Sequence, residues 1–134
     1  MYTVTGETSP GGEAALSART SRIVFDGSAQ SGDILPGPAD LLCAALSECI
    51  LKNVERFSKL LPFHYIAASI RVEAEREEPP PRIVRMRYVL RVVTDESPHR
   101  VELLHTNILK FGTITNTLKA ACDIHGEIVA EPPP

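Results

Sequence analysis

The segment from Pro38 to Phe63, PADLLCAALSECILKNVERFSKLLPF, constrains the fold more than any other part of the sequence. Apolar or small residues recur in it with helical spacing, at positions 42, 46, 49, 50, 57, 60 and 61. Charged side chains form the opposite stripe, at Glu48, Lys52, Glu55 and Lys59. Pro38 suits the first turn of a helix, and Pro62 closes it. We therefore predict a long helix with one apolar face to bury against a sheet.

Two alternating runs after this helix predict that sheet. Apolar side chains occupy every second position, first at Ile66, Ala68, Ile70, Val72 and Ala74, and then at Val84, Met86, Tyr88, Leu90 and Val92. Folding the runs about the proline turn EEPPPR places Glu75 opposite Arg85 and Glu73 opposite Arg87. We expect an antiparallel ribbon with one solvated, charged face.

The remaining segments complete an α+β domain. The turn residues TSPGG, between two β-prone runs, predict a hairpin or small meander over residues 1–25, and the segment from Asp26 to Gly37 is expected to be a loop. A second helix is predicted from Ser97-Pro98 to near Gly112, followed by a further helical turn or two in TITNTLKAAC and a final strand in DIHGEIVA. Residues 1–134 are thus expected to form one domain of order β, long α, ββ, α, α, β.

Composition excludes several classes of function and suggests a compartment. A net charge of -3 and a pI near 5.8 argue against an electrostatic surface for nucleic acid or membrane. The start MYTVTGETSPGGE does not have the pattern of a signal peptide, and no apolar run approaches the ~18 residues of a membrane span. Three cysteines are too few for a disulfide framework. We expect a cytoplasmic protein.

Known motifs predict neither a metal nor a cofactor. The four histidines are scattered, at His64, His99, His105 and His125, and no pair has ligand spacing. The sequence has no P-loop, no dinucleotide glycine fingerprint and no G-x-S-x-G elbow. A hydrolase that uses Cys49 with His64 or His105 therefore has little support.

Cys43 and Cys49 lie six residues apart on the predicted long helix. At ~100° and 1.5 Å per residue they point about 120° apart and lie about 9 Å apart along the axis, too far for a disulfide within one straight helix. Cys49 continues the apolar stripe, whereas Cys43 lies off it. Cys49 is either a small hydrophobe of the core or a thiolate at a partly accessible seam with a cation near it.

The combination of GPADLLCAALSECILKNVERFSKLLPF, a long β-ribbon and ILKFGTITNTL resembles the OsmC/Ohr family in motifs and in the order of elements. The family's helix has a proline, a carboxylate one or two places on, a Leu-rich turn, Ala-Ala, and a cysteine about ten residues after the proline. This sequence matches that pattern at Pro38, Asp40, Leu41, Leu42, Ala44, Ala45 and Cys49. The resemblance extends from about Arg19 to Ile128. It implies an OsmC-like α+β fold and an intertwined homodimer with two cysteine-centred sites at the subunit interface.

The resemblance also implies a chemistry, because the characterised members reduce organic hydroperoxides. Cys49 would attack the peroxide O–O bond as a thiolate and become a sulfenic acid. A helper arginine would stabilise the developing charge, and a carboxylate would orient that arginine. Asp40 and Arg22 are the residues expected in these roles, with Arg19 the other upstream arginine. Asp40 lies ~13.5 Å along the helix from Cys49, so we expect it to act across a dimer interface.

Each of these two supporting residues has a simpler alternative. Asp40 is explained at least as well by a charge at the helix N-terminus, and Arg22, like Arg19, is better explained as a solvated strand residue.

The sequence departs from the family pattern at the second cysteine. The family's resolving cysteine usually opens a C-P-x-S stretch after the second helix, which corresponds here to GTITNTL and places Gly112 at that position. Cys122 follows ten residues later and is either a resolving thiol or a buried thiol at the end of a strand. We expect a thiol-dependent peroxidase, including a one-cysteine cycle in which an external thiol or dithiol regenerates Cys49. The alternative is a non-catalytic member of the same fold, either a small-apolar-ligand binder or a redox-sensing module.

Overall fold

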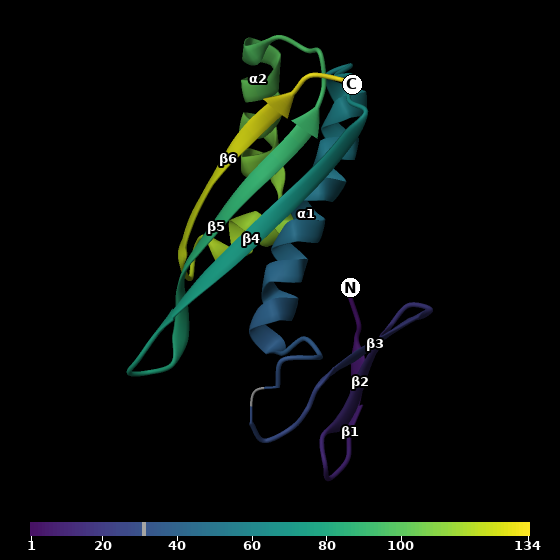
Figure 1. The fold of residues 1–134 in the computed structure, drawn as a ribbon, viewed down its shortest axis with the longest axis vertical. Helices are drawn as coiled ribbons and strands as arrows, with labels where there is room; N and C mark the ends of the chain where they lie inside the picture. Colours follow the sequence, from purple (N-terminus) through teal and green to yellow (C-terminus); the bar gives the residue numbers. More distant parts are fainter. Residues whose placement is uncertain (31) are drawn as a thin grey trace. The chain divides into compact units, whose positions relative to one another are not determined.

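The computed structural model describes residues 1–30 and 32–134. Ser31, within the predicted loop from Asp26 to Gly37, lies outside the described residues. The elements follow the predicted order: β1 (Thr5–Thr8), β2 (Glu13–Ala18), β3 (Ser21–Asp26), α1 (Pro38–Leu60), β4 (Ala67–Glu77), β5 (Arg82–Val93), α2 (Pro98–Phe111), α3 (Thr113–Leu118) and β6 (Asp123–Glu131) (Figure 1). The chain divides into two compact units, Met1–Leu42 and Cys43–Pro134. The α+β prediction is confirmed; the single-domain assignment stays a prediction.

The N-terminal unit contains an antiparallel meander of β1, β2 and β3. The turn between β1 and β2 uses Gly11 and Gly12, whose φ angles of 97° and 92° are readily adopted only by glycine. This confirms the turn predicted from TSPGG. The first turn of α1 also belongs to this unit.

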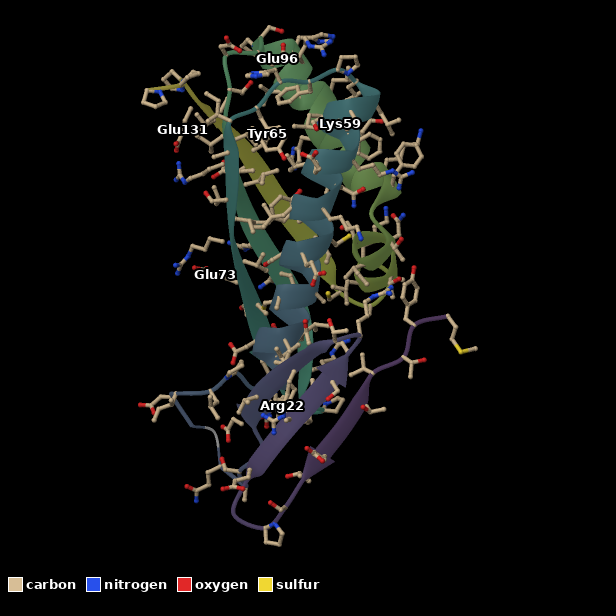
Figure 2. The ribbon with its side chains drawn as sticks, turned by 90° about the vertical axis from the view of Figure 1, so that its right-hand side faces the viewer. Arg22, Lys59, Tyr65, Glu73, Glu96 and Glu131 are labelled. Atoms are coloured by element: carbon tan, nitrogen blue, oxygen red, sulfur yellow. The ribbon has the colours of Figure 1, made fainter. Side chains whose placement is uncertain are left out.

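The C-terminal unit is built on a second sheet in the order β4-β5-β6. β4 and β5 pair antiparallel, with Glu75 opposite Arg85 and Glu73 opposite Arg87, which is the predicted register. Glu73 points away from the helices, on the charged face of the sheet (Figure 2). β6 pairs with β5 in parallel, and the crossover through α2 and α3 provides the length that a parallel connection needs.

The core of this unit lies between the sheet and the helices. Figures 1 and 2 show α2, and α1 from Cys43 onward, on the same face of the sheet. The largest fully buried apolar side chains come from α1, β5 and α2: Leu46, Ile50 and Val54 on α1, Met86, Leu90 and Val92 on β5, and Leu104 and Ile108 on α2. Leu60, a member of the predicted apolar stripe, is 62% exposed, while the polar Asn53 is buried. The helix therefore turns a partly polar face to the core.

Local interactions set the ends of the helices. Ser97 caps α2 by accepting a hydrogen bond from the Arg100 N–H at 3.3 Å, with Pro98 in the first turn, as predicted. The Arg100 guanidinium in turn donates to the carbonyls of Leu61 and Pro62, just beyond the end of α1. These bonds satisfy carbonyls that have no partner within the helix. In the part of the chain that the structure describes, no helix is both long and apolar enough to cross a membrane.

Candidate thiol site at Cys49

Cys49 lies on α1 in the C-terminal unit and is half-buried. Three residues of that unit lie next to its sulfur atom. The Asn53 Nδ2 atom lies 3.7 Å from Sγ and the Thr115 Oγ1 atom 4.0 Å from it. The third neighbour is Gly112, between α2 and α3. The site therefore brings together one turn of α1 and the start of α3.

Asn53 follows Cys49 by four residues, so the two side chains share one face of α1. Asn53 is 8% exposed. Its Nδ2 group donates a hydrogen bond to the Cys49 carbonyl oxygen at 2.8 Å and also contacts the sulfur. An amide nitrogen carries two hydrogens, so one can serve the carbonyl while the other points to the sulfur.

Thr115 comes from the first turns of α3 and is 2% exposed. Within the described residues, the hydrogen-bond contact of its hydroxyl is the Cys49 sulfur. Either atom of this contact could be the donor, and a thiol is a weak hydrogen-bond partner, so the hydroxyl gains little from the contact while the cysteine is neutral. Sequence reasoning missed both polar neighbours of the sulfur. The i, i+4 spacing could have indicated Asn53, but Thr115 is distant in sequence.

Gly112 lies directly against the sulfur. A Cβ atom added there would lie 3.1 Å from Cys49 Sγ and 2.9 Å from Thr115 Oγ1. The backbone of Gly112, with φ -72° and ψ 118°, is one that any residue adopts. The position that the family resemblance matched to a second cysteine is thus beside the Cys49 sulfur.

Asp40 and Arg22 lie in the N-terminal unit. The Asp40 carboxylate accepts a hydrogen bond from the Gly37 N–H at 2.9 Å, while the Gly37 carbonyl accepts from Leu41 N–H. This is half of a capping box, with Gly37 at the N-cap and Asp40 at the third helical position. The contacts of the Cys49 sulfur given above come from the other unit. The catalytic role of Asp40 stays a prediction.

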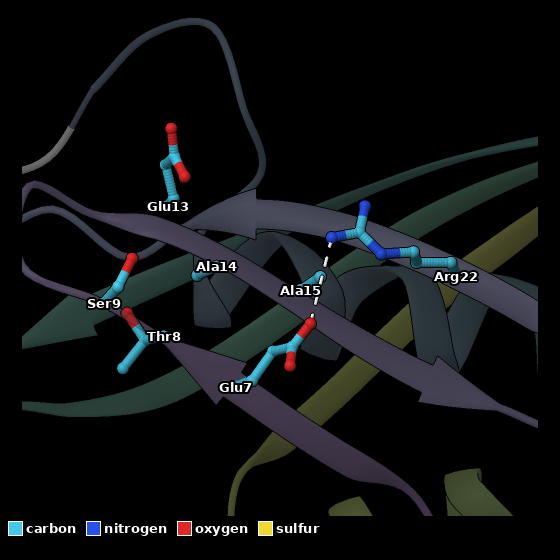
Figure 3. Close-up of a pocket in the computed structure, with 7 residues that line it drawn as sticks. All are labelled: Glu7, Thr8, Ser9, Glu13, Ala14, Ala15 and Arg22. Atoms are coloured by element: carbon cyan, nitrogen blue, oxygen red, sulfur yellow. Dashed lines mark ion pairs between the residues drawn. The ribbon is translucent and has the colours of Figure 1, made fainter.

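Arg22 lies on β3 and pairs with Glu7 across the meander at 4.0 Å, with both side chains exposed. The two residues line a surface pocket of about 210 Å³, which Glu13 also borders (Figure 3). An exposed pair of this kind contributes little to stability. Its carboxylate partner here is Glu7, and the predicted role of Arg22 beside Cys49 stays a prediction.

The other two cysteines differ from Cys49 in their surroundings. The Cys122 thiol donates to the Leu118 carbonyl oxygen at 3.5 Å. Burial raises the pKa of this thiol, and the nearby Asp123 carboxylate adds to the effect. Cys122 is therefore a weaker nucleophile at neutral pH than an ordinary thiol. Cys43 is half-buried, and its carbonyl accepts a hydrogen bond from the Ser47 hydroxyl at 2.8 Å.

Across residues 1–30 and 32–134, no three His, Cys, Asp or Glu residues form a group that could hold a metal ion.

The fold and the thiol on its long helix define a known class of protein. A family model described as OsmC-like protein matches residues 30–126, so the chain belongs to the OsmC-like family. Among curated proteins, none matches this chain by sequence. The relationship is therefore visible in the family pattern and in the fold.

Solved structures show the same architecture. An OsmC-like protein from Mycoplasma pneumoniae superposes with a TM-score of 0.88 at 14% identity, covering 97% of this chain and 96% of the other. The organic hydroperoxide resistance protein OhrB of Bacillus subtilis gives 0.74 at 14% identity, covering 96% and 98%. An organic hydroperoxide resistance protein OsmC from Legionella pneumophila gives 0.72 at 12% identity, covering 96% and 97%. At these identities the likeness establishes the fold.

Proposed function

We propose that this chain is a thiol-dependent peroxidase that reduces organic hydroperoxides through Cys49. The observation that carries the proposal is a half-buried thiol whose sulfur contacts two buried polar side chains, Asn53 and Thr115, on an OsmC-like fold. The names of the Bacillus and Legionella proteins, which are called organic hydroperoxide resistance proteins, support the choice of substrate class.

The reaction begins with the Cys49 thiolate. Its sulfur attacks the terminal oxygen of the hydroperoxide, so that an S–O bond forms while the O–O bond breaks. The sulfur is oxidised by two electrons to a sulfenic acid. The hydroperoxide is reduced to an alkoxide, which takes a proton from water and leaves as the alcohol.

The return to the thiol uses an external reductant, because glycine occupies position 112 and burial raises the pKa of the Cys122 thiol. A first thiol attacks the sulfenic sulfur, releases water and forms a mixed disulfide with Cys49. A second thiol attacks that disulfide, frees Cys49 and leaves as the oxidised reductant. One dithiol molecule supplies both thiols in turn. The requirement for free thiols supports a cytoplasmic location.

The supporting groups belong to the same proposal. In an intertwined homodimer, Asp40 and Arg22 would complete the site of a partner subunit. Exposed apolar side chains of the N-terminal unit support such an interface: Ile23, Val24, Ile34 and Leu35 are between 39% and 91% exposed. A guanidinium close to the sulfur would stabilise the thiolate and the developing alkoxide.

A second candidate is a non-catalytic member of the fold that binds a small apolar ligand or senses redox state through Cys49. Gly112 in place of a second cysteine favours it, because an internal disulfide with that position is not available. This candidate predicts saturable ligand binding, or a single oxidation of Cys49, without turnover.

Steady-state turnover separates the two candidates. The reduced protein is mixed with cumene hydroperoxide and dithiothreitol, and the loss of hydroperoxide and the appearance of the alcohol are followed. The peroxidase proposal predicts catalytic consumption that Cys49→Ser abolishes and that the matched control on the same helix, Cys43→Ser, retains. Consumption equal to the rate without protein would reject the enzyme and leave the binder or sensor.

A further inference from the structure

Two polar side chains beside the Cys49 sulfur, Asn53 and Thr115, have no role in the reaction described above. We propose that Thr115 and Asn53 hold the Cys49 sulfur as a thiolate, and we call these two side chains the thiol cradle. The inference deepens the proposed function, since the thiolate is the form that attacks the peroxide. Both residues contact the reacting atom itself.

The strongest observation is the unusual bonding of Thr115. Thr117, two residues on in the same short helix, makes the common bond of a helical threonine: its hydroxyl donates to the carbonyl four residues back, at Thr113, at 2.9 Å. The Thr115 hydroxyl instead faces the sulfur at 4.0 Å. A hydroxyl buried beside so weak a partner gains little from the neutral thiol, so a stronger acceptor at the sulfur would improve its hydrogen bonding.

Ionisation of Cys49 supplies the missing partner. A thiolate is a full negative charge with acceptor capacity, and hydrogen bonds to charged groups are about twice as strong as those between neutral groups. The Thr115 hydroxyl can rotate to donate to it, and the Asn53 Nδ2 group, 3.7 Å from the sulfur, has a second hydrogen that it can donate. Neither side chain carries a charge and both are buried, so the cradle acts by hydrogen bonding from groups that are shielded from water.

The two donors hold the sulfur from different elements. Asn53 is fixed by its bond to the Cys49 carbonyl, and Thr115 is fixed by its burial at the start of α3. The thiolate is therefore kept in one orientation, with Gly112 against a further side. A positioned, ionised sulfur is what an in-line attack on an O–O bond requires.

The test is the pH dependence of alkylation of Cys49, which does not depend on peroxidase activity. Cys43→Ser and Cys122→Ser leave Cys49 as the single thiol, and the rate of its reaction with iodoacetamide is measured from pH 5 to 11. Thr115→Val removes the hydroxyl while keeping the shape, and Thr115→Ser restores a hydroxyl. Thr117→Val is the matched control on the same helix, and Asn53→Leu tests the second donor from α1.

We expect Thr115→Val and Asn53→Leu each to lower the alkylation rate at pH 7 by about tenfold, the order expected for a lost hydrogen bond to a charge. The rates should converge with the parent at high pH, where the thiol is ionised in every variant. Thr115→Ser and Thr117→Val should follow the parent profile.

Superimposable profiles for Thr115→Val, Asn53→Leu and the parent would overturn the cradle. A rate lowered equally at every pH would also overturn it, because that is the signature of a purely structural change. If the profiles shift as expected while the parent fails to consume hydroperoxide, the cradle stands and the proposed peroxidase function fails. The two inferences are thus separated.

Discussion

Gly112→Cys is expected to turn the chain into a protein with an internal disulfide to Cys49. The Cβ of the new residue would lie 3.1 Å from Cys49 Sγ. In a disulfide, with an S–S bond of about 2.05 Å, the Cβ of one cysteine lies about 3 Å from the sulfur of the other. Two other atoms are close: Thr115 Oγ1 at 2.9 Å, which ends a side chain that can rotate, and the Ile108 carbonyl oxygen at 3.2 Å, which must give by a few tenths of an ångström. We therefore expect the bond to form with only a small shift of the atoms around Gly112.

The expected gain in stability follows from the number of residues that the disulfide encloses. A loop of about 63 residues loses enough entropy in the unfolded state to stabilise the fold by about 4 kcal/mol. For a chain of this length, that corresponds to a rise in the melting temperature of about 10–16 °C. Oxidised and reduced samples are compared by thermal unfolding, and the disulfide is identified by intact mass and peptide mapping.

Gly112→Ser is the matched control, because it adds a side chain of similar size that cannot form the bond. It should melt at one temperature with and without reductant. The reasoning would be refuted if oxidised Gly112→Cys kept its thiols free while folded, since the 3.1 Å approach of Gly112 to the sulfur would then be wrong. It would also be refuted by a disulfide to another cysteine.

Three further predictions concern the C-terminal unit. Burial lowers the pKa of His105, with a smaller opposing effect of a nearby glutamate, so the folded state favours the neutral ring. The free energy of unfolding should therefore keep its full value above pH ~6.5 and decrease below that pH, where the ring is protonated in the unfolded chain. His105→Asn should reduce the difference between the free energies of unfolding measured by urea titration at pH 7.5 and 5.5. Gly126→Ala places a Cβ 2.1 Å from the Tyr88 ring, so urea unfolding should show a loss of about 1–3 kcal/mol, and a variant of unchanged stability would contradict this packing. Arg100→Ala leaves the Leu61 carbonyl without its donor and should cost about 1–2 kcal/mol in the same assay, with Arg100→Lys recovering part of the loss.

Most elements of the fold could be predicted because each has its own periodicity in the sequence. The alternation of the two ribbon strands also fixed their register, since a slip by one residue would turn Met86 and Leu90 toward solvent. The pairing of β6 could not be predicted in the same way. A short strand of mixed polarity such as DIHGEIVA does not encode its partner or its direction, which depend on how α2 and α3 cross the sheet.

The site was predictable in part for similar reasons. Cys49 is visible through the helix motif, and Gly112 through its place after the second helix. Thr115 approaches the sulfur from 66 residues away along the chain, so only the tertiary fold brings it there. The local bond of Asp40 to Gly37 is the helix-terminal role that the sequence offered as the alternative.

The most direct test of the central claim is the fate of the Cys49 sulfur in the first moments after exposure to a peroxide. Fully reduced protein is mixed by stopped flow with one equivalent of cumene hydroperoxide, and the product is followed by intact mass with a sulfenic-acid trap. The account predicts rapid oxidation confined to Cys49, which Cys49→Ser removes. Oxidation no faster than that of a free thiol, and equal in the native chain and Cys49→Ser, would contradict it.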